Sequence, residues 1–408
     1  MDATDDAAPP QVRPLGPEDA VPTRSLGWEA FGSPPNADPA EPAPWPLRPG
    51  MHGYGVFGPD GDLLARMIDR EYDSWFSGVT VPTSGIAGVT VAAEHRGRGL
   101  LTPLFAHVLG AARRRGAVLS TLFPTAPRIY RRFGYEIVGS LDYVDLPTTS
   151  LAAVRAPDGL VARRATGSDV PAVKDVYDAW ASAQNGPLTR RGPSFPDSAG
   201  ELLAAYSGIT VAVDAAGGVH GYASWSRGPG YGTESLLEVS DLVSTRHDAA
   251  AVLLRTLGSF ASVTPTTRLR TSGGPVGDVV RLHLPSADWR VAELEPYMLR
   301  LLDPEQALTS RRYPHHTVAE LTFTLSDEFL RDLDGTYRLT VRDGEAHCRR
   351  TGTAEGPCFT GRGLAMLYAG AQGTANLRMA GLLEGDDSRD ATWDSLFGGH
   401  QVHIRDYF

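Results

Sequence analysis

Hydrophobic and polar positions between residues 89 and 116 follow the pattern of a strand, a tight turn and a helix. The stretch VTVAAEHRGRGLL starts with an apolar run that ends at Val91 and continues into an Arg-Gly-Arg-Gly turn. Pro103 suits the first turn of the helix that follows, and Gly116 suits its end. The helix is predicted from apolar residues at helical spacing, namely Leu101, Leu104, Phe105, Val108, Leu109 and Ala112.

The rest of the chain up to residue 147 alternates between strand and helix patterns. A short strand, an acidic cap and a helix are expected within Val12–Phe31, and the Pro- and Ala-rich segment Gly32–Gly50 predicts an extended loop. Further strands are predicted at Tyr54–Phe57, Leu63–Ile68, Val118–Phe123 and Tyr135–Leu146, with a short helix at Arg128–Phe133.

The same order of elements restarts near Leu160. The predicted elements are a strand at VARRA, a helix capped by Ser168 and Asp169, a hairpin of Ile209–Asp214 with Val219–Trp225, a strand at Leu236–Ser244 and a helix at His247–Phe260. We interpret this region as a divergent second copy of the first unit, with an unrelated α/β domain as the alternative. STRHDAAAV stands where the first copy has AEHRGRGLL, so the second copy lacks the glycines that could cradle a phosphate.

After Pro304 the pattern changes again and predicts a small α+β domain. The chain is therefore divided into residues 1–148, 149–302 and 303–408. The predicted elements of the last part are strands at Val318–Leu325, Tyr337–Val341, Ala346–Arg350 and Val402–Phe408, and helices at Leu364–Ala371 and Ala391–Phe397.

Composition narrows the classes of partner. A net charge of −10 disfavours nucleic acid and suits a cationic substrate, although solubility alone accounts for it equally well. No apolar run approaches the ~20 residues that span a bilayer, and the acidic start MDATDDAAPP lacks the pattern of a signal peptide. Cys348 and Cys358 form no zinc pattern and are expected to stay reduced in a cytoplasm.

The Arg-Gly-Arg-Gly turn has the chemistry of a diphosphate site. Main-chain N–H groups, the positive end of the following helix and the guanidinium groups of Arg96 and Arg98 all attract an anion. The spacing fits neither a P-loop nor a Rossmann fingerprint. It resembles the acetyl-CoA pyrophosphate loop of the GNAT acetyltransferases, whose pattern Gln/Arg-x-x-Gly-x-Gly/Ala falls on Arg96, Gly99 and Leu101. Leu101 departs from the usual small residue.

Three segments resemble the Eis (enhanced intracellular survival) family of bacterial GNAT enzymes: VPTSGIAGVTV, HRGRGLL and IYRRFGYE. The aromatic residue at position 408 agrees with this resemblance, which covers nearly the whole chain. It implies an α+β fold with two tandem GNAT-type mixed-sheet domains, the second degenerate, followed by a sterol-carrier-protein-like domain. The motifs are specific in the first unit only, and the insertion at Gly32–Gly50 departs from the family.

The resemblance also implies roles for individual residues. Tyr130 matches the general acid, and the carboxylate of Phe408 matches the general base. Family members acetylate amino groups of aminoglycosides with acetyl-CoA and assemble as hexamers, and no metal is expected. The implied acetyl-CoA contacts are Val89, Thr90, Val91, Arg96, Gly97, Arg98, Gly99, Leu100, Leu101, Thr102, Thr125 and Ala126.

The residues alone leave alternatives open. Tyr135 is a second candidate for the acid, and His403 is an alternative base, whereas His95 is expected on the surface and His107 off the apolar stripe of its helix. The end of the chain, including Phe408, could instead pack as an ordinary last strand. Three acidic residues are expected to be solvated: Glu136, Asp142 and Asp145.

Two other functions are compatible with the sequence. One is acetylation of lysines in proteins or peptides. The other is a binding module without catalysis, in which the third domain holds a lipid and the first unit serves only as scaffold.

Overall fold

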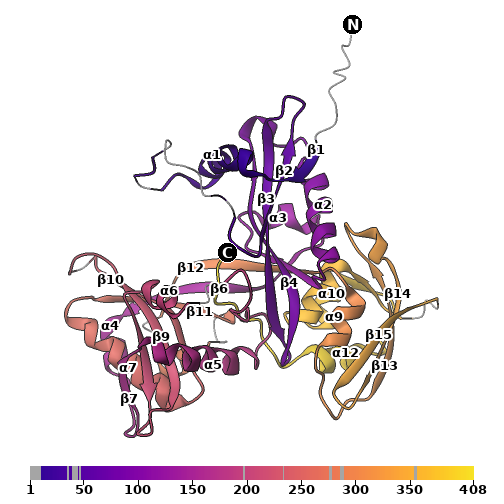
Figure 1. Ribbon diagram of the computed structural model, residues 1–408. Helices are drawn as coiled ribbons and strands as arrows, with labels where there is room; N and C mark the ends of the chain where they lie inside the picture. Colours follow the sequence, from indigo (N-terminus) through magenta and orange to yellow (C-terminus); the bar gives the residue numbers. More distant parts are fainter. Residues whose placement is uncertain are drawn as a thin grey trace.

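The computed structural model describes residues 11–34, 36–38, 45, 47–195, 198–232, 234–274, 278–284, 289–352 and 356–408. The acidic N-terminal decapeptide, and residues 35, 39–44 and 46 of the predicted Pro-rich loop, lie outside the described residues. Figure 1 shows three lobes that meet at the centre, where the C-terminus lies. We name them the first unit (residues 11–148), the second unit (149–302) and the third domain (303–408).

The first unit contains the predicted strand–turn–helix. All six residues of the predicted apolar stripe are buried in the core between the helix and the sheet, and each of the five larger side chains contributes about 1.5–3 kcal/mol. The elements are β1 Gln11–Pro14, α1 Ala20–Phe31, β2 Met51–Phe57, β3 Leu63–Phe76, β4 Val79–Val91, α2 Leu101–Arg114, β5 Leu119–Leu122, α3 Pro127–Arg131 and β6 Glu136–Pro147. The next helix, α4 Thr148–Ala152, starts at the last residue of this unit and packs in the second unit.

The second unit repeats this order, as the sequence predicts. The predicted strands and helices begin and end within a few residues of their predicted bounds, whereas the helix Ala199–Ala204 and the strands Thr266–Ser272 and Arg290–Leu301 were not predicted. The elements are β7 Val161–Arg164, α5 Val170–Ala181, α6 Ala199–Ala204, β8 Gly208–Val213, β9 Val219–Arg227, β10 Leu236–Ser244, α7 His247–Gly258, β11 Thr266–Ser272 and β12 Arg290–Leu301.

The two units share one continuous sheet because they exchange strands. The order is β1-β2-β3-β4-β5-β12-β6-β11-β10-β9-β8-β7. β12 of the second unit therefore lies between β5 and β6 of the first, and β6 lies between β12 and β11. Each strand from β1 to β6 has a counterpart in the second unit, from β7 to β12 in the same order. When each strand is given the name of its counterpart, the sheet has the same strand order from either edge. This pseudo-symmetry fixes the two units relative to each other.

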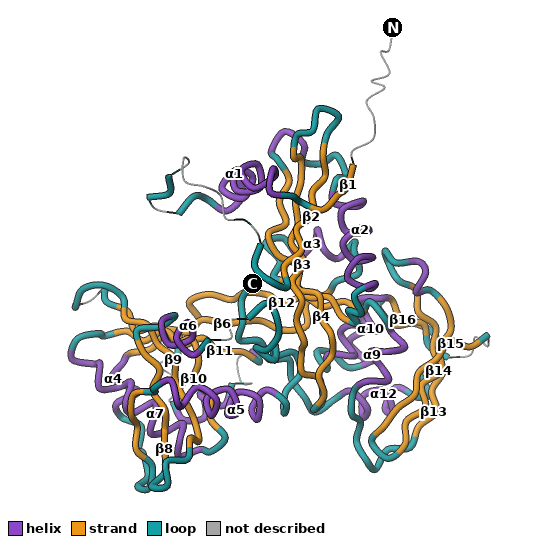
Figure 2. The backbone as a smooth tube through the Cα atoms, viewed as in Figure 1, coloured by secondary structure: helices purple, strands orange, loops and turns teal. Residues whose placement is uncertain are grey.

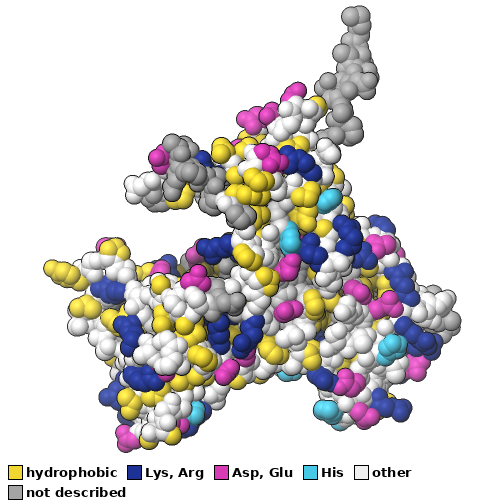
Figure 3. All heavy atoms as spheres, viewed as in Figure 1, with side chains coloured by type: hydrophobic (Ala, Val, Ile, Leu, Met, Phe, Trp, Pro, Cys, Tyr) yellow, Lys and Arg dark blue, Asp and Glu magenta, His cyan; other side chains and the backbone are white. Residues whose placement is uncertain are grey.

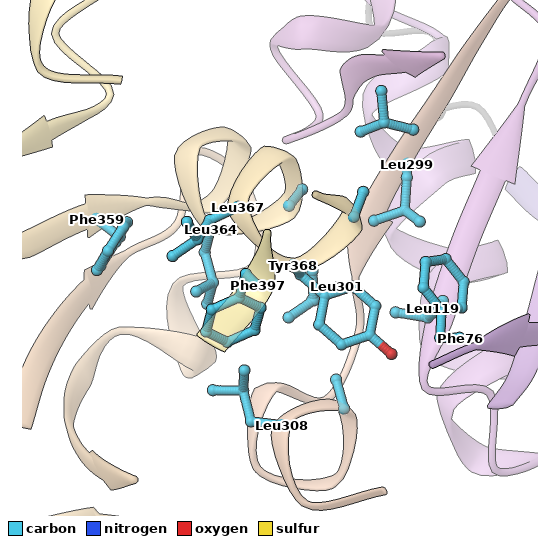
Figure 4. Packing of buried hydrophobic residues seen from close by; sticks show 14 of the residues in the cluster. Phe76, Leu119, Leu299, Leu301, Leu308, Phe359, Leu364, Leu367, Tyr368 and Phe397 are labelled. Carbon is cyan, nitrogen blue, oxygen red and sulfur yellow. The ribbon is translucent and has the colours of Figure 1, made fainter. Parts of the chain in front are cut away.

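The third domain packs its helices between its own five-stranded sheet and the first unit (Figure 2). Leu299 and Leu301 of β12 contribute to the same apolar core as Leu364 and Leu367 of the third domain (Figure 4). This shared core fixes the third domain against the first unit. Its elements are α9 Pro304–Ser310, β13 Ala319–Ser326, β14 Gly335–Arg342, β15 Glu345–Thr351, β16 Cys358–Thr360, α10 Gly361–Ala369, α11 Thr374–Met379, β17 Leu383–Glu384 and α12 Asp390–Phe397.

One predicted element is wrong. The segment Val402–Phe408 is not a strand: it forms a single bridge, between Val402 and Asn185, and otherwise runs as an irregular tail. Its polar side chains are bound by other side chains rather than facing solvent, which is why the alternating pattern misled the prediction. Within the described part of the chain, no helix has the length and apolar character needed to cross a membrane.

Candidate active site

β4 separates from its neighbour β5 at the centre of the first unit. The two strands pair in parallel over Thr83–Ile86 and Leu119–Leu122, but β4 continues to Val91 after β5 has ended. A bulge with Gly88 at φ 56° also interrupts the pairing of β4 with β3. The main chain of Val89–Val91 therefore borders an opening where an extended ligand could pair as an added strand.

The glycine turn follows this opening directly. Gly97 and Gly99 have φ of 78° and 77°, so backbone conformation requires glycine at both positions, while a Cβ on either would meet open space. Glu29 of α1 supports the turn: its Oε1 accepts from the Ala93 N–H at 2.8 Å and lies 3.7 Å from Nη2 of Arg96. α2 begins at Leu101, and its first turn carries no acidic residue.

A cavity of about 640 Å³ joins the opening of β4 to the glycine turn and α3. Ten of the predicted acetyl-CoA and catalytic residues line it: Val89, Thr90, Val91, Arg96, Gly97, Gly99, Leu100, Leu101, Thr125 and Tyr130. Five further lining residues were not predicted as site residues: Ala30, Phe31, His95, Ile129 and Arg132. His95 belongs to the HRGRGLL segment, and Ile129 and Arg132 belong to IYRRFGYE, whereas no motif marks Ala30 and Phe31.

Four predicted site residues are not among the lining residues: Arg98, Thr102, Ala126 and the predicted base Phe408. Arg98 is exposed, and the Thr102 N–H donates to the Gly99 carbonyl at 3.0 Å within the turn itself. Ala126 is the residue that precedes α3. The amides available to an anion are thus those in the middle of the turn, from Gly97 to Leu101.

Thr90 gives a test of whether the cavity fits a polar ligand. Its side chain is 3% exposed, and among the described residues its Oγ1 has no hydrogen-bond partner. A buried hydroxyl without a partner is costly. The amide-rich arm of a coenzyme A thioester would supply one, so the residues present fit such a ligand.

The two candidate tyrosines differ in position. Tyr130 of α3 lines the cavity, and its hydroxyl interacts with Thr125. Burial, together with the neighbouring Tyr407, raises the pKa of Tyr130 to about 12, so the phenol is protonated at neutral pH. Tyr135 is fully buried in the core, where its hydroxyl lies 2.6 Å from Oγ of Ser120, and it does not line the cavity.

The tail brings aromatic side chains to the same region from the third domain. The ring of Tyr407 lies 4.6 Å from that of Phe123, which follows β5. The ring of Phe408 lies 5.0 Å from Tyr72 of β3 and 5.4 Å from Phe123. A Cβ on Gly85 of β4 would approach the Phe408 ring to 2.9 Å, so this glycine makes room for it.

Comparison with known proteins agrees with the geometry. Models of the acetyltransferase (GNAT) domain match residues 11–138 and 186–301, and a sterol carrier protein domain matches residues 304–405. An uncharacterized N-acetyltransferase of Streptomyces coelicolor is 30% identical over 318 residues, 74% of this chain and 75% of the relative. The N-acetyltransferase Eis of Mycobacterium tuberculosis is 27% identical over 327 residues, 76% of each chain. The chain belongs to the Eis family of GNAT N-acetyltransferases.

Solved structures show the same fold over almost the whole chain. A GCN5-related N-acetyltransferase from Kribbella flavida has a TM-score of 0.81 at 26% identity, covering 98% of this chain and 99% of that one. Eis1 from Mycobacterium abscessus has a TM-score of 0.74 at 22% identity, covering 98% and 100%. The predicted α+β class, with two GNAT units and a sterol-carrier-like domain, is confirmed.

The histidines of this Eis-family chain differ from expectation in one case. His95, expected on the surface, is half-buried and lines the cavity. The ring of His107 packs 5.3 Å from that of Tyr54. His403, the alternative base, lies away from the cavity with Nδ1 3.0 Å from Oγ of Ser272, and burial together with Arg405 lowers its pKa to about 4.

The expectation that three acidic residues are solvated is wrong. Glu136, Asp142 and Asp145 are each only 5–6% exposed. Glu136 binds Arg131 and Arg362, so its carboxylate ties α3 to α10 of the third domain. On the face seen in Figure 3, basic and acidic side chains are interspersed over all three lobes.

Proposed function

We propose that the first unit transfers an acetyl group from acetyl-CoA to an amino group of a cationic small molecule such as an aminoglycoside. The supporting observation is the single cavity that contains the opened strand, the glycine turn and Tyr130. The amine attacks the thioester directly, without an acyl-enzyme.

The chain supplies the groups that hold the donor. Main-chain amides from Gly97 to Leu101 and the guanidinium of Arg96 face the diphosphate, in the manner of other helix N-termini that bind anions. The main chain of Val89–Val91 pairs with the extended arm, and Thr90 donates or accepts through its free hydroxyl.

Two protons must move during transfer. Tyr130, protonated because of its raised pKa, donates to the thiolate as it leaves. The carboxylate of Phe408 accepts the proton of the amine. The ring contacts of Phe408 with Tyr72 and Phe123 hold the end of the chain beside β3 and β5, where its carboxylate is proposed to act.

Acidic groups beside the tail support a cationic acceptor. Glu293 and Glu295 of β12 lie close enough to Tyr407 to raise its pKa further, after burial. Burial and a hydrogen bond with Glu293 raise the pKa of Glu295 in turn. Two neighbouring carboxyl groups attract an incoming ammonium group, and the net charge of −10 acts in the same direction.

The test is an acceptor screen that measures thiol release from acetyl-CoA. Aminoglycosides and polyamines form one arm, lysine peptides the second and neutral amines the third. Turnover with the first arm supports the proposal, while turnover with peptides alone favours the lysine acetyltransferase. A chain without catalysis that only binds lipid would show neither thiol release nor a rise in melting temperature with acetyl-CoA.

A homo-oligomer, with six copies as in the family resemblance, is part of the same proposal. Mass photometry of the purified chain tests it. A mass near six chains supports the hexamer, and a monomer at micromolar concentration contradicts it.

A further inference from the structure

β10 of the second unit has the geometry of β4 of the first. Its parallel ladder with β11 ends at the pair Val239 and Leu269, as that of β4 ends at Ile86. A bulge next to Asp241 then interrupts its pairing with β9, and the strand continues to Ser244. The second unit thus has its own opening between the strands that correspond to β4 and β5.

The tail of the chain lies at this opening. Arg405 donates through Nη1 to the carbonyl of Arg270, the first residue of β11 beyond the ladder, at 2.8 Å. Arg270 returns the contact by donating through Nη1 to the Arg405 carbonyl at 3.1 Å. Arg405 also binds Asp278 through Nη2 at 2.8 Å, and it is 1% exposed.

An ion triad links the bulge of β10 to the tail: Asp241 is buried, while the side chains of Arg190 and Asp406 are 22% and 19% exposed. Arg190 lies between Asp241 at the bulge and Asp406 of the tail, with Nη1 2.5 Å from Asp241 Oδ2 and Nε 2.9 Å from Asp406 Oδ1. Tyr222 donates to Asp241, and Tyr177 lies 3.3 Å from Asp406 Oδ2. The carboxylate of Asp406 is therefore tied to the bulge of β10 through one guanidinium group.

The start of the tail is fixed at a junction of all three domains. Asn185 of the second unit accepts from the His403 N–H at 2.8 Å and from the Ser77 N–H of the first unit at 2.9 Å. Its Nδ2 donates to Ala369 of the third domain at 3.1 Å. A Cβ on Gly186 would lie 2.9 Å from the His403 carbonyl, so the tail passes in close contact here.

We propose that the second unit holds the tail of its own chain in the groove where the first unit holds its donor, and that Arg190, Asp241 and Asp406 are positioning residues for Phe408. In this proposal the groove of the second unit binds the tail instead of acetyl-CoA and holds it in place. We call this arrangement the clamp. It fixes Asp406 two residues before Phe408, whose ring contacts Tyr72 and Phe123, while Tyr407 between them lies close enough to Tyr130 to raise its pKa. This inference rests on the proposed role of Phe408.

The test uses Asp406→Ala in the 408-residue chain, because Arg190 then keeps Asp241 and no unpaired charge is left buried. We expect kcat to fall at least tenfold while the Kd for acetyl-CoA changes less than twofold. Carboxypeptidase A should release Phe408 at least ten times faster than from the unaltered chain. Asp145→Ala is the matched control, since Asp145 is also an aspartate held by arginines, Arg268 of β11 and Arg290 of β12, but does not contact the tail.

Equal kcat and equal Phe408 release in the two variants would overturn the proposal. If Asp406→Ala does not fold, Asp406→Asn, which keeps the size of the side chain, is measured in the same way. Extension of the chain by Gly-Ser after Phe408 separates the role of the Phe408 carboxylate as a base from the positioning of the tail by the second unit. An active extended enzyme removes the carboxylate from the mechanism, whereas faster release of Phe408 from Asp406→Ala still demonstrates the clamp.

Discussion

The two GNAT units have the same order of strands, but they differ at the start of one helix. In the first unit two glycines with positive φ precede α2, and no carboxylate lies in its first turn. In the second unit Asp248 occupies the first turn of α7, where its Oδ1 accepts from the Ala249 N–H at 2.9 Å and its carboxylate pairs with Arg246. The helix end that could attract a diphosphate therefore already carries an anion of its own.

The difference shows that topology alone does not make a cofactor site. Both units open the sheet at the same place, yet one opening borders a cavity of about 640 Å³ and the other is occupied by the tail. A donor site needs the open strand, free amides and room together. The second unit keeps the open strand, but the cavity beside Asp241 is only about 170 Å³ and its helix start carries Asp248, so binding of one acetyl-CoA per chain is expected.

The largest expected effect comes from placing an anion in the first unit's turn. Gly99→Asp should weaken acetyl-CoA binding by more than 100-fold, because a carboxylate would face the diphosphate and φ of 77° disfavours a side chain. Isothermal titration calorimetry measures the loss. Gly217→Asp is the control: its φ is 86°, it too has open space around it, and it lies in a hairpin turn of the second unit. An unchanged Kd in Gly99→Asp would show that the turn does not bind the donor.

Tyr130→Phe should lower kcat by about 100-fold, within the range for loss of a general acid, and leave acetyl-CoA affinity nearly unchanged. Tyr135→Phe is the matched control, since it removes a hydroxyl bonded to Ser120 in the core. That variant should lose about 1 kcal/mol of unfolding free energy but keep its kcat. Equal kcat values for the two variants would refute the assignment of Tyr130. Steady-state kinetics and thermal unfolding give both quantities.

Gly85→Ala should reduce kcat by about tenfold, because its Cβ would lie 2.5 Å from Tyr72 and 2.9 Å from Phe408 and would displace the tail by a fraction of an ångström. The control Gly200→Ala adds a methyl group where nothing lies within 4 Å. Kinetics at saturating acetyl-CoA separate this effect from donor binding. A fully active Gly85→Ala enzyme would show that the position of Phe408 is not critical.

The smallest expected effect is a loss of unfolding free energy at low pH, caused by His403 of the tail, which contacts Ser272 of the second unit. Burial, then Arg405, lowers the folded-state pKa of His403 to about 4, while the unfolded value is near 6.5. The unfolded chain therefore binds more protons between these values, and stability falls as pH falls through this window. From pH 7 to pH 5 this residue should cost about 2 kcal/mol of unfolding free energy. Chemical denaturation of His403→Gln should show a loss smaller by that amount; an equal loss would exclude His403 as the cause.

Local patterns in the sequence were enough to predict the site-forming elements. The apolar run to Val91, the glycines and the apolar stripe of α2 are short-range features, and each specifies its own conformation. For β3 the prediction stopped at Ile68 because the following residues are mostly polar. The strand continues because Asp69 is buried against Arg115 and Ser84, which are distant in sequence.

Non-local pairing accounts for what the sequence could not predict. The exchange of β6 and β12 depends on partners more than 140 residues apart, and the α1 residues Ala30 and Phe31 reach the cavity only through the tertiary fold. The tail looked like a strand because apolar and polar residues alternate from Val402 to Arg405, although the alternation ends at Asp406. Its polar residues Arg405 and Asp406 instead bind charged groups of the second unit that no local pattern reveals.

The most direct test of the central claim is a crystal structure of this chain with coenzyme A bound. The account predicts one nucleotide per chain, with its diphosphate within about 3 Å of main-chain nitrogens between Gly97 and Leu101 and its arm along Val89–Val91. A diphosphate bound at the second unit, or at a surface apart from the glycine turn, would contradict it.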